Sequence, residues 1–395
     1  MQRTCAGGPR PLTARLLAVL LCSALLAAVG ATQPASAVTA ALQLTVASNV
    51  GEFHFQENIA VTGYLRTPDG SPLGGRTVYV QRKSGAGWVT LATTTTLDSG
   101  HYRLWVRNDA SFSFRTYAKA ASGFGAAASR TLDETRLSGG QTLEQRYAQV
   151  APWLKAPTSK VNTGHSNGSD LRWRSYEKGM LVESAGRTFM VTGAVLAGYL
   201  KAGGPAGRLG APRTDADCFR TLDKCLQAFA GGSVFYNRQS VTKATTHVAY
   251  GAGVASELIV VAASQVGYVE PGVKINKYND WNGRNVAWCG VFLSWVSAIG
   301  NNGEAVPQVH TFASLVDEVT SRGVSSTPKL GALVFMTFNG GTDATHVGIV
   351  TKVLADGRVE TIEGNTVITG GSDARVVTTK MRTPSQIRYY YYPGT

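Results

Sequence analysis

Cys289 stands at the start of an apolar stretch that has the spacing of a buried helix. Val291, Phe292 and Trp295 recur at helical intervals, and Gly300 is a natural place for the helix to end. The pattern therefore predicts that Cys289 lies in the first turn of a helix. Because the unpaired N–H groups and the dipole at a helix N-terminus stabilise negative charge, they lower the pKa of a thiol and favour the thiolate. A thiolate here could attack a carbonyl carbon, whereas the alternative is a cysteine that serves only as a small buried side chain.

The N-terminal residues have the composition of a secretory signal peptide. Three arginines precede an apolar run over residues 16–29, and Ala35-Ser36-Ala37 has the small-x-small pattern of a cleavage site. The run is too short for a membrane-spanning helix. Leu21 is too bulky for a lipoprotein site at Cys22, so we expect no lipid anchor. We predict a signal peptide over residues 1–37 and a secreted mature protein.

The five cysteines single out Cys289 in a second way. Cys5 and Cys22 would leave with the signal peptide, so that three cysteines would remain. Cys218 and Cys225 are close together in a polar segment, which predicts a local disulfide in an exported protein. Cys289 would then be a free thiol in an oxidising compartment, and such a thiol is a candidate nucleophile.

A predicted hairpin downstream could supply the acid–base partner for this thiol. Residues 346–353 and 358–365 have the alternation of strands, and a four-residue turn separates them. That loop length pairs His346 with Asn365. Because side chains alternate with a period of two, this register places His346, Glu363 and Asn365 on one face of the hairpin, whereas a shift of one residue would separate them.

These groups are the set that a cysteine hydrolase requires. The imidazole of His346 would take the thiol proton and later return one to the leaving amine, while Glu363 would hold the ring and support its charge. Taken singly, His346 could be a structural histidine and Glu363 a solvated residue at a strand end. Their occurrence together with Cys289 in one region favours a catalytic role.

The region from about residue 256 to residue 392 resembles the CHAP domain, a papain-like family of cysteine, histidine-dependent amidohydrolases and peptidases that act on peptidoglycan. The motifs that carry the resemblance are Gly267-Tyr268, Lys277-Tyr278, Ala287-Trp288-Cys289, Phe292-Leu293-Ser294-Trp295, His346-Val347-Gly348-Ile349-Val350 and Thr361-Ile362-Glu363-Gly364-Asn365-Thr366. The resemblance implies an α+β catalytic domain over residues 255–395. It also implies Cys289 as nucleophile, His346 as general base and acid, Glu363 as the residue that orients His346, and Asn365 as a fourth polar group. Ala287, Gly290 and Ala332 depart from residues that are frequent in the family, and none of these changes removes a catalytic group.

Residues 38–130 have the pattern of an all-β domain. Short alternating runs are separated by turn segments such as Pro68-Asp69-Gly70 and Asp98-Ser99-Gly100, a spacing that predicts a β-sandwich. The expected strands cover residues 59–65, 77–81, 88–93 and 102–106. The pattern resembles the immunoglobulin-like modules of bacterial surface proteins, and we expect no chemistry in it.

Residues 137–251 contain an internal repeat. Tyr176, Gly179, Leu181 and Val195 recur 53 residues later as Phe229, Gly232, Val234 and Val248, and Leu154-Lys155-Ala156-Pro157 recurs 55 residues later as Leu209-Gly210-Ala211-Pro212. The second copy resembles the LGFP repeat of actinobacterial cell-wall proteins, from which the first copy departs at Lys155 and at Glu177-Lys178. The resemblance implies a wall-binding module, because repeats of this kind present a broad surface and not a reactive centre.

The positive charge of the chain is concentrated before the catalytic region. The net charge is +13, and residues 38–254 hold 24 basic and 14 acidic side chains, whereas residues 255–395 hold 11 of each. A basic exported region suits the anionic polymers of a bacterial wall. We expect no nucleic-acid partner, because the basic residues are dispersed and no recognition motif is present. His165, His247 and His310 have no metal-ligand spacing, and we expect no metal or other cofactor.

The sequence thus predicts a multidomain protein with an immunoglobulin-like β-sandwich, an LGFP-like wall-binding region and an α+β papain-like catalytic domain. The expected function is hydrolysis of an amide bond in peptidoglycan through an acyl-enzyme, at either the N-acetylmuramoyl–L-alanine bond or a peptide bond. Two alternatives stay open. The same thioester could pass its acyl group to an amine, as in a transpeptidase, or the protein could be a wall-binding adhesin without catalysis.

Overall fold

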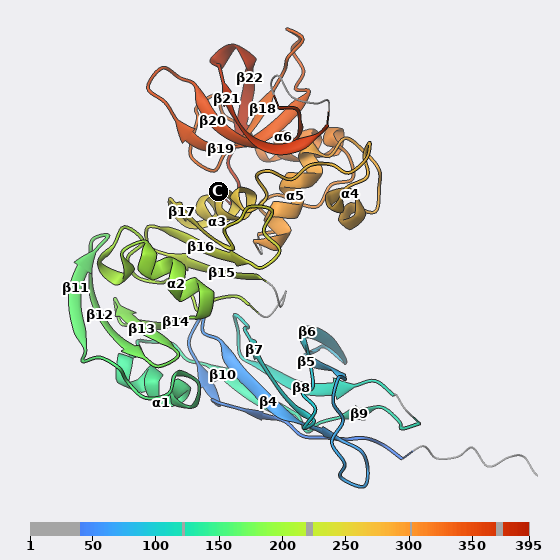
Figure 1. The fold of residues 1–395 in the computed structure, drawn as a ribbon, viewed down its shortest axis with the longest axis vertical. Coiled ribbons are helices and arrows are strands. Elements are labelled where there is room, and N and C mark those ends of the chain that lie inside the picture. The colour runs from blue at the N-terminus through green and yellow to red at the C-terminus, as the bar shows by residue number, and fades with distance from the viewer. Residues whose placement is uncertain (1–39, 121–122, 219–223, 301, 369–373, 395) are drawn as a thin grey trace, which may run out of the picture. The chain divides into compact units, whose positions relative to one another are not determined.

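The computed structural model describes residues 40–120, 123–218, 224–300, 302–368 and 374–394, all within one compact unit of the chain, Ala40–Thr395. The predicted signal peptide, with Cys5 and Cys22, lies outside the described residues. None of the described helices is both long and apolar enough to cross a membrane. The described residues form three successive regions along the chain (Figure 1).

The first region is built from strands alone, as predicted, and its strands form two sheets. One sheet contains β1 (Gln43–Leu44), β2 (Ala47–Ser48), β4 (Ile59–Arg66) and β7 (His101–Val106), and the other contains β3 (Glu52–Phe53), β5 (Thr77–Ser84), β6 (Gly87–Thr95), β8 (Phe112–Ala118), β9 (Ala127–Ala128) and β10 (Leu132–Arg136). Val61 and Leu104 of the first sheet share one buried core with Val80 and Phe114 of the second. Strand β10 pairs with β8 and therefore belongs to the second of these sheets.

The second region contains two small sheets, each with a helix before it. The first half consists of α1 (Leu143–Leu154), β11 (Asn162–Ser166), β12 (Ser169–Tyr176), β13 (Gly179–Ser184) and β14 (Arg187–Thr192). The second half consists of α2 (Gly193–Lys201), η1 (Gly204–Ala206), β15 (Lys224–Phe229), β16 (Gly232–Asn237) and β17 (Thr246–Tyr250). The predicted Cys218–Cys225 disulfide is present and leads into β15.

The repeated residues occupy equivalent places in the two halves. Each hairpin turns between the aromatic residue and the glycine of the repeat, at Tyr176 and Gly179 in the first half and at Phe229 and Gly232 in the second. Three neighbours of the hairpin also recur: a proline that forms a β-bridge to the aromatic residue, a tyrosine that stacks on that residue, and a leucine that lies against the glycine. They are Pro157, Tyr147 and Leu154 in the first half and Pro212, Tyr199 and Leu209 in the second. A Cβ atom on Gly179 would lie 2.6 Å from the Leu154 side chain, and one on Gly232 would lie 2.9 Å from the Leu209 side chain. Both copies therefore use glycine for the same close approach.

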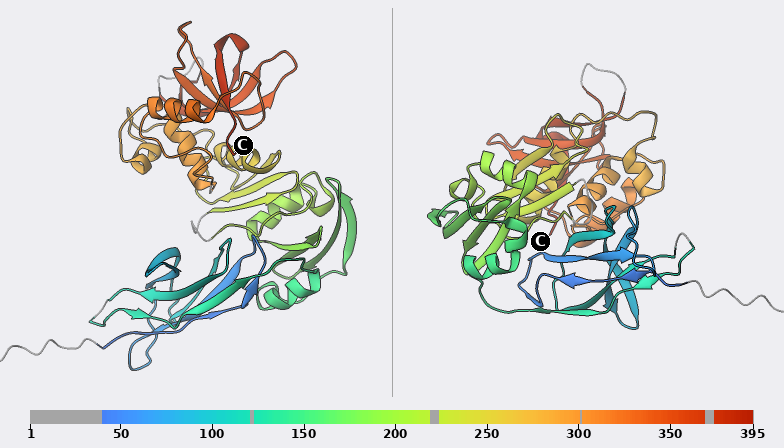
Figure 2. Two further views of the ribbon diagram at one scale, coloured as in Figure 1. Left: turned by 180° about the vertical axis from the view of Figure 1, so that it is seen from behind. Right: turned by 60° about the horizontal axis from the view of Figure 1, so that its bottom comes forward.

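The third region is an antiparallel sheet with helices. Its helices are α3 (Gly253–Ala263), α4 (Lys277–Asn282), α5 (Cys289–Ile299) and α6 (Phe312–Arg322), and its strands are β18 (Leu333–Met336), β19 (His346–Val353), β20 (Val359–Thr366), β21 (Val376–Arg382) and β22 (Ile387–Tyr391), with η2 (Pro384–Gln386) before the last strand. The strand order is β21-β20-β19-β18-β22. Helix α5 packs against β19 and β20, and the views in Figure 2 show α4, α5 and α6 grouped beside the sheet.

Helix α3 joins the second and third regions. It packs on β16 and β17 as well as on α5, β19 and β20, and its residues Ser256 to Ala262 are buried almost without interruption. Phe235 of β16 consequently belongs to the same buried core as Val291 of α5 and Ile349 of β19. The helix begins at Gly253, and the Ser256 hydroxyl lies inside it, 2.8 Å from the hydroxyl of Ser233 on β16.

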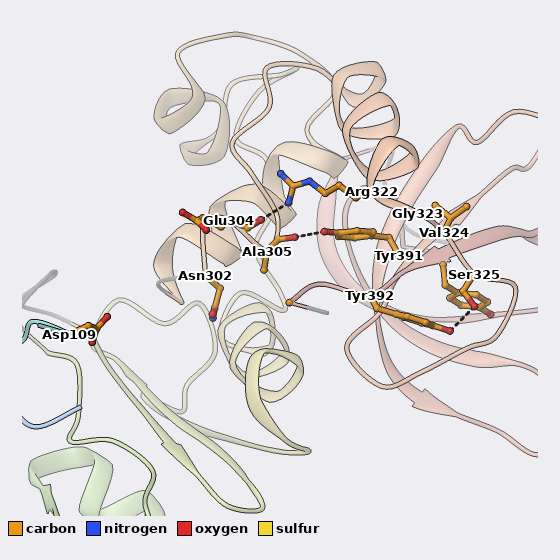
Figure 3. Close-up of a pocket in the computed structure, with 13 residues that line it drawn as sticks. Asp109, Asn302, Glu304, Ala305, Arg322, Gly323, Val324, Ser325, Tyr391 and Tyr392 are labelled. Carbon is orange, nitrogen blue, oxygen red and sulfur yellow. Dashed lines mark hydrogen bonds between the residues drawn. The ribbon is translucent and has the colours of Figure 1, made fainter. Parts of the chain in front are cut away.

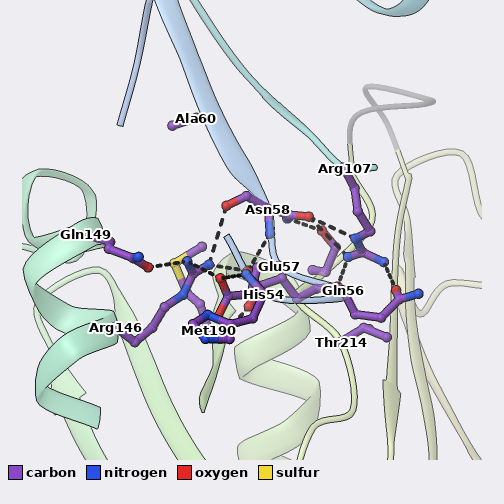
Figure 4. Close-up of polar contacts among 12 residues, drawn as sticks. His54, Gln56, Glu57, Asn58, Ala60, Arg107, Arg146, Gln149, Met190 and Thr214 are labelled. Carbon is purple, nitrogen blue, oxygen red and sulfur yellow. Dashed lines mark hydrogen bonds and ion pairs between the residues drawn. The ribbon is translucent and has the colours of Figure 1, made fainter. Parts of the chain in front are cut away.

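A buried cluster of charged and polar side chains connects the first region with the second (Figure 4). Arg146 of α1 is fully buried, and its guanidinium lies 2.5 Å from Asp215 and 3.3 Å from Glu57. Asp215 also accepts a hydrogen bond from the backbone N–H of Asn58, and the Asn58 side chain accepts one from Arg107. Because buried charges are tolerated only when they are paired, this cluster depends on all its members.

Candidate active site

Cys289 is the first residue of α5, where the sequence placed it. The first helical hydrogen bond runs from the N–H of Phe292 to the carbonyl of Trp288, at 2.8 Å. The N–H groups of the first turn, including that of Cys289, therefore have no partner within the helix. Cys289 is the free cysteine among the described residues and is 3% exposed. A negatively charged sulfur at this position is favoured by the helix dipole.

Trp288 and Gly364 fix the start of α5 against the sheet. The Trp288 ring is fully buried, stacks on Tyr278 and donates a hydrogen bond from Nε1 to Glu270, at 3.1 Å. A Cβ atom on Gly364 would lie 2.8 Å from Trp288 and 2.9 Å from Phe292. Glycine at position 364 thus allows the N-terminus of α5 to approach β20 closely, next to Glu363.

His346 opens β19 and links the thiol to a carboxylate. Its Nε2 atom lies 2.9 Å from Oε2 of Glu363, and its ring also hydrogen-bonds with Cys289. Burial lowers the pKa of His346, but the hydrogen bonds and charges of Cys289 and Glu363 outweigh that effect and raise the pKa to about 9. The imidazolium form is therefore favoured at neutral pH, which is the form that a thiolate partner stabilises.

The pairing of β19 with β20 agrees with the expected register near the site and differs from it near the turn. Ile349 pairs with Ile362 and Val350 with Thr361, as a four-residue loop requires. Beyond Val350 a bulge shifts the register by one residue. Because the shift lies on the turn side, it leaves His346 and Glu363 in contact. A sequence pattern of strict alternation contains no sign of such a bulge.

Glu363 is a buried carboxylate with four hydrogen bonds. Besides His346, it accepts hydrogen bonds from Thr361 Oγ1 at 2.6 Å and from two nitrogen atoms of Arg382, at 2.7 and 2.5 Å. Burial raises the pKa of Glu363, but Arg382 and His346 lower it to about 2. A Cβ atom on Gly348 would lie 2.7 Å from Cγ of Glu363, so glycine there provides the room for this side chain.

Arg382 is the residue of this site that sequence reasoning missed. It lies at the end of β21, outside the motifs of the resemblance, and no spacing rule connects it with Glu363. The alternation of residues 376–382 could have indicated a strand beside the hairpin. It could not have indicated which of its basic residues reaches the carboxylate.

Asn365 lies at an irregular step of β20. Its φ angle is 56°, in the left-handed region that asparagine tolerates better than most residues, and the pairing with β21 shifts between Glu363 and Thr366. Asn365 lines a cleft together with Cys289 and His346. The structure thus brings all four predicted site residues into one place, three at the cleft and Glu363 behind His346.

The cleft has a volume of about 680 Å³ and a mixed lining. Its apolar wall includes Phe312, Phe338 and the strongly exposed Val273, and its charged groups are Glu270, Lys274, Arg375, Lys380 and Arg382. Among the described residues, no group of three or more His, Cys, Asp or Glu side chains is arranged to hold a metal ion. The cleft presents the Cys289 thiol and the His346 imidazole, with the Glu363 carboxylate behind the ring.

A larger hollow, of about 1090 Å³, lies apart from Cys289 (Figure 3). It is formed by the segment after α5, the end of α6 and the end of β22. Its wall is held by hydrogen bonds from Arg322 to the carbonyl of Glu304 and from the Tyr391 hydroxyl to the carbonyl of Ala305. None of its lining residues is a cysteine or a histidine. Volume alone therefore does not locate the candidate site.

One of the comparisons with known proteins covers this site. Residues 280–365 match the model of the CHAP domain family. The comparison with curated proteins gave no match. Among solved structures, the D00-D0 domain of intimin is similar to part of the chain, with a TM-score of 0.19 and 15% identity, over 25% of this chain and 48% of that chain. This chain thus spans about half the length of that structure. The matched CHAP segment runs from α4 through Asn365, so Cys289, His346 and Glu363 all lie within a CHAP domain.

Proposed function

We propose that the protein is a secreted cysteine-dependent hydrolase of peptidoglycan, with Cys289 as nucleophile and His346 as general base and acid. The observation that carries the proposal is the hydrogen-bonded series from Cys289 through His346 to Glu363, placed beside a cleft and within a CHAP domain. A CHAP domain indicates hydrolysis of the amidase or peptidase type. The identities of the nucleophile and the base are our assignment.

In the first half of the proposed reaction, the Cys289 thiolate attacks the carbonyl carbon of an amide. The carbonyl oxygen becomes an oxyanion, which the free N–H groups at the start of α5 can stabilise. The His346 imidazolium then gives its proton to the leaving nitrogen, the C–N bond breaks, and an amine departs. A thioester joins the acyl part of the substrate to Cys289, and His346 is left neutral.

In the second half, a water molecule replaces the amine. Neutral His346 takes one proton from the water as its oxygen attacks the thioester carbonyl. Collapse of the tetrahedral intermediate breaks the C–S bond, releases the carboxylic acid and returns the thiolate–imidazolium pair. Glu363 keeps one orientation of the ring through both halves, because its own position is held by Thr361 and Arg382.

The preceding regions supply the proposed location of the substrate. A signal peptide over residues 1–37 would export the protein. The region 38–254, in which basic side chains outnumber acidic ones, would adhere to peptidoglycan and to anionic wall polymers. We assign wall binding to the LGFP-like repeats of residues 137–251. Binding of the wall by these regions raises the concentration of amide bonds near the cleft.

The test uses purified residues 38–395 on isolated cell wall, with mass spectrometry of the released fragments. Cys289→Ser and His346→Ala should abolish the release of fragments and leave sedimentation with the wall unchanged. His310→Ala is the matched control for the second variant, because His310 is an exposed histidine of the same region. New amine or new carboxylate ends identify the bond that is cleaved, whether muramoyl–L-alanine or peptide.

Two other outcomes would replace the proposal. Wall binding without any release by the wild-type protein would support an adhesin. Products in which an added amine, such as glycinamide, is joined to the acyl part in preference to water would support a transpeptidase that uses the same thioester.

A further inference from the structure

We propose that Arg382 is a positioning residue for this reaction: its guanidinium holds the Glu363 carboxylate ionised and in one orientation, so that the carboxylate can hold the His346 ring against Cys289. This inference rests on the function proposed above. Arg382 comes from β21, whereas His346 comes from β19 and Glu363 from β20, so three neighbouring strands meet at the carboxylate.

The contact between Arg382 and Glu363 has a defined geometry. Nε of Arg382 lies 2.7 Å from Oε1, and Nη2 lies 2.5 Å from Oε2, so each carboxylate oxygen receives one nitrogen of the fork. A bidentate pair of this kind fixes the plane of the carboxylate as well as its distance. Because the same Oε2 contacts Nε2 of His346 at 2.9 Å, the fork also determines where the imidazole is held.

The remaining contacts leave Glu363 little freedom. Thr361 Oγ1 donates to Oε1 at 2.6 Å, and the side chain of Glu363 is fully buried over Gly348. Without Arg382, the carboxylate would keep one neutral donor and His346. A buried carboxylate that loses a charged partner is stabilised in its protonated form, and a protonated carboxyl no longer supports an imidazolium.

Phe338 connects Arg382 with the rim of the cleft. The guanidinium carbon lies 4.7 Å from the centre of the Phe338 ring, and that ring lies 5.8 Å from the ring of His346. The side chain of Arg382 is 13% exposed and lines the cleft, so it is close to the reacting groups without being bound to them. This placement suits a residue that acts through Glu363.

The charged groups near the Arg382–Glu363 pair come from several elements around the cleft. His346 and Arg382 contact Glu363 directly, and Cys289 of α5 lies on the far side of His346. The other charged groups that line the cleft are Glu270 and Lys274 before α4, Arg375 before β21, and Lys380 on β21. Arg382 is the one that donates two hydrogen bonds to the Glu363 carboxylate in the described part of the chain.

Two substitutions separate the charge of Arg382 from its fork. Arg382→Lys keeps a positive charge but cannot bind both carboxylate oxygens in one plane. We expect kcat to fall by roughly 10- to 100-fold with KM little changed, because the His346 ring is displaced while substrate binding is unaffected. Arg382→Met removes the charge as well. In that variant Glu363 should take up a proton at a higher pH than in the wild type, so the acid limb of the kcat/KM profile should move to higher pH.

The experiment records the pH profile of wall hydrolysis by residues 38–395, together with the pH profile of Cys289 alkylation by iodoacetamide. Arg322→Met is the matched control. Arg322 also contacts a glutamate with two nitrogens, but both lie against Oε1 of Glu318, at 2.9 and 2.6 Å, and the pair is on the exposed surface of α6. This control should leave both profiles unchanged, and circular dichroism should report a folded protein in every variant used for comparison.

Arg382→Met with a wild-type acid limb would overturn the proposal, and so would Arg382→Lys with full kcat. A loss of activity that is equal at all pH values and equal in both variants would assign Arg382 a structural role only. The alkylation profile keeps the test separate from the proposed function. If the wild-type protein releases nothing from the wall, hydrolysis fails as a proposal, while the pH profile of Cys289 alkylation still shows whether Arg382 controls the His346–Glu363 pair.

Discussion

Substitution of Phe235 by alanine should destabilise the catalytic region, although Phe235 belongs to a strand of the second repeat. Phe235 is 1% exposed and lies in the buried core that also contains Val260 of α3, Val291 of α5 and Ile349 of β19. Removal of a buried phenylalanine ring costs about 3–5 kcal/mol, because its contacts are lost and the space is refilled only in part. With a urea dependence of about 2–3 kcal/mol per M, the transition should move by about 1–2.5 M.

The assay measures the urea concentration at which hydrolytic activity is lost, beside the concentration at which circular dichroism changes. Phe229→Ala is the matched control. Phe229 is also fully buried and lies on β15, the neighbouring strand of the same repeat. It packs on Tyr199 in a separate core that contains no residue of α5 or of the β18–β22 sheet. The loss of activity should therefore move further in Phe235→Ala than in Phe229→Ala.

The opposite result would refute the reasoning. If Phe235→Ala leaves the activity midpoint at the wild-type urea concentration while the circular dichroism transition moves, the catalytic region is stable without the second repeat. The shared core of α3 would then be a contact between separate folding units. A fragment that begins at residue 252 should in that case keep full activity.

Three further predictions concern the site and the buried charges. The alkaline limb of the pH profile of wall hydrolysis should lie near pH 9, because Cys289 and Glu363 raise the pKa of His346 to about 9 and the imidazolium is lost above it; pH profiles of the wild type and of Glu363→Gln, in which this limb should move to lower pH, measure it. Gly364→Ala should cost about 1–3 kcal/mol and reduce kcat, because the new methyl group would meet Trp288 at 2.8 Å; melting curves and wall hydrolysis measure both effects. Arg146→Met should cost about 3–5 kcal/mol, because it leaves buried carboxylates without their cation, while kcat of the folded protein stays the same.

Each of these predictions has an outcome that contradicts it. An alkaline limb that stays in place in Glu363→Gln would mean that the carboxylate does not support the imidazolium of His346. Full activity and a wild-type melting temperature in Gly364→Ala would mean that α5 does not press on β20. A small effect of Arg146→Met, below about 1 kcal/mol, would mean that water reaches the cluster.

The parts of the site that could be predicted from the sequence are those fixed by local periodicity. The helical spacing after Cys289 placed the thiol at the start of α5, since a helix of that composition must bury most of its residues. The loop length of the hairpin likewise paired Ile349 with Ile362 and so brought His346 to Glu363. Both inferences use only neighbours along the chain.

The parts that could not be predicted depend on contacts between distant segments. Helix α3, for example, is buried almost throughout because it packs on β16 and β17 as well as on α5, β19 and β20, and its helical pattern does not show which strands it will contact. Arg382 is likewise joined to Glu363 only through the pairing of β20 with β21. One basic residue among several on an alternating strand is not distinguished by its spacing.

The irregular step at Gly364 and Asn365 shows how the two kinds of information combine. Strict alternation would place the side chains of Asn365 and Glu363 on the same face of β20. The pairing with β21 instead shifts between Glu363 and Thr366, and Asn365, with its left-handed φ, lies within this shift. A Gly-Asn pair inside a strand pattern is itself a sign of a bulge, because both residues tolerate such backbone angles. The step has a consequence for the site: Glu363 is fully buried behind His346, whereas Asn365 lines the cleft beside Cys289. Two polar residues of one strand are therefore placed differently, one in contact with the imidazole and one at the cleft.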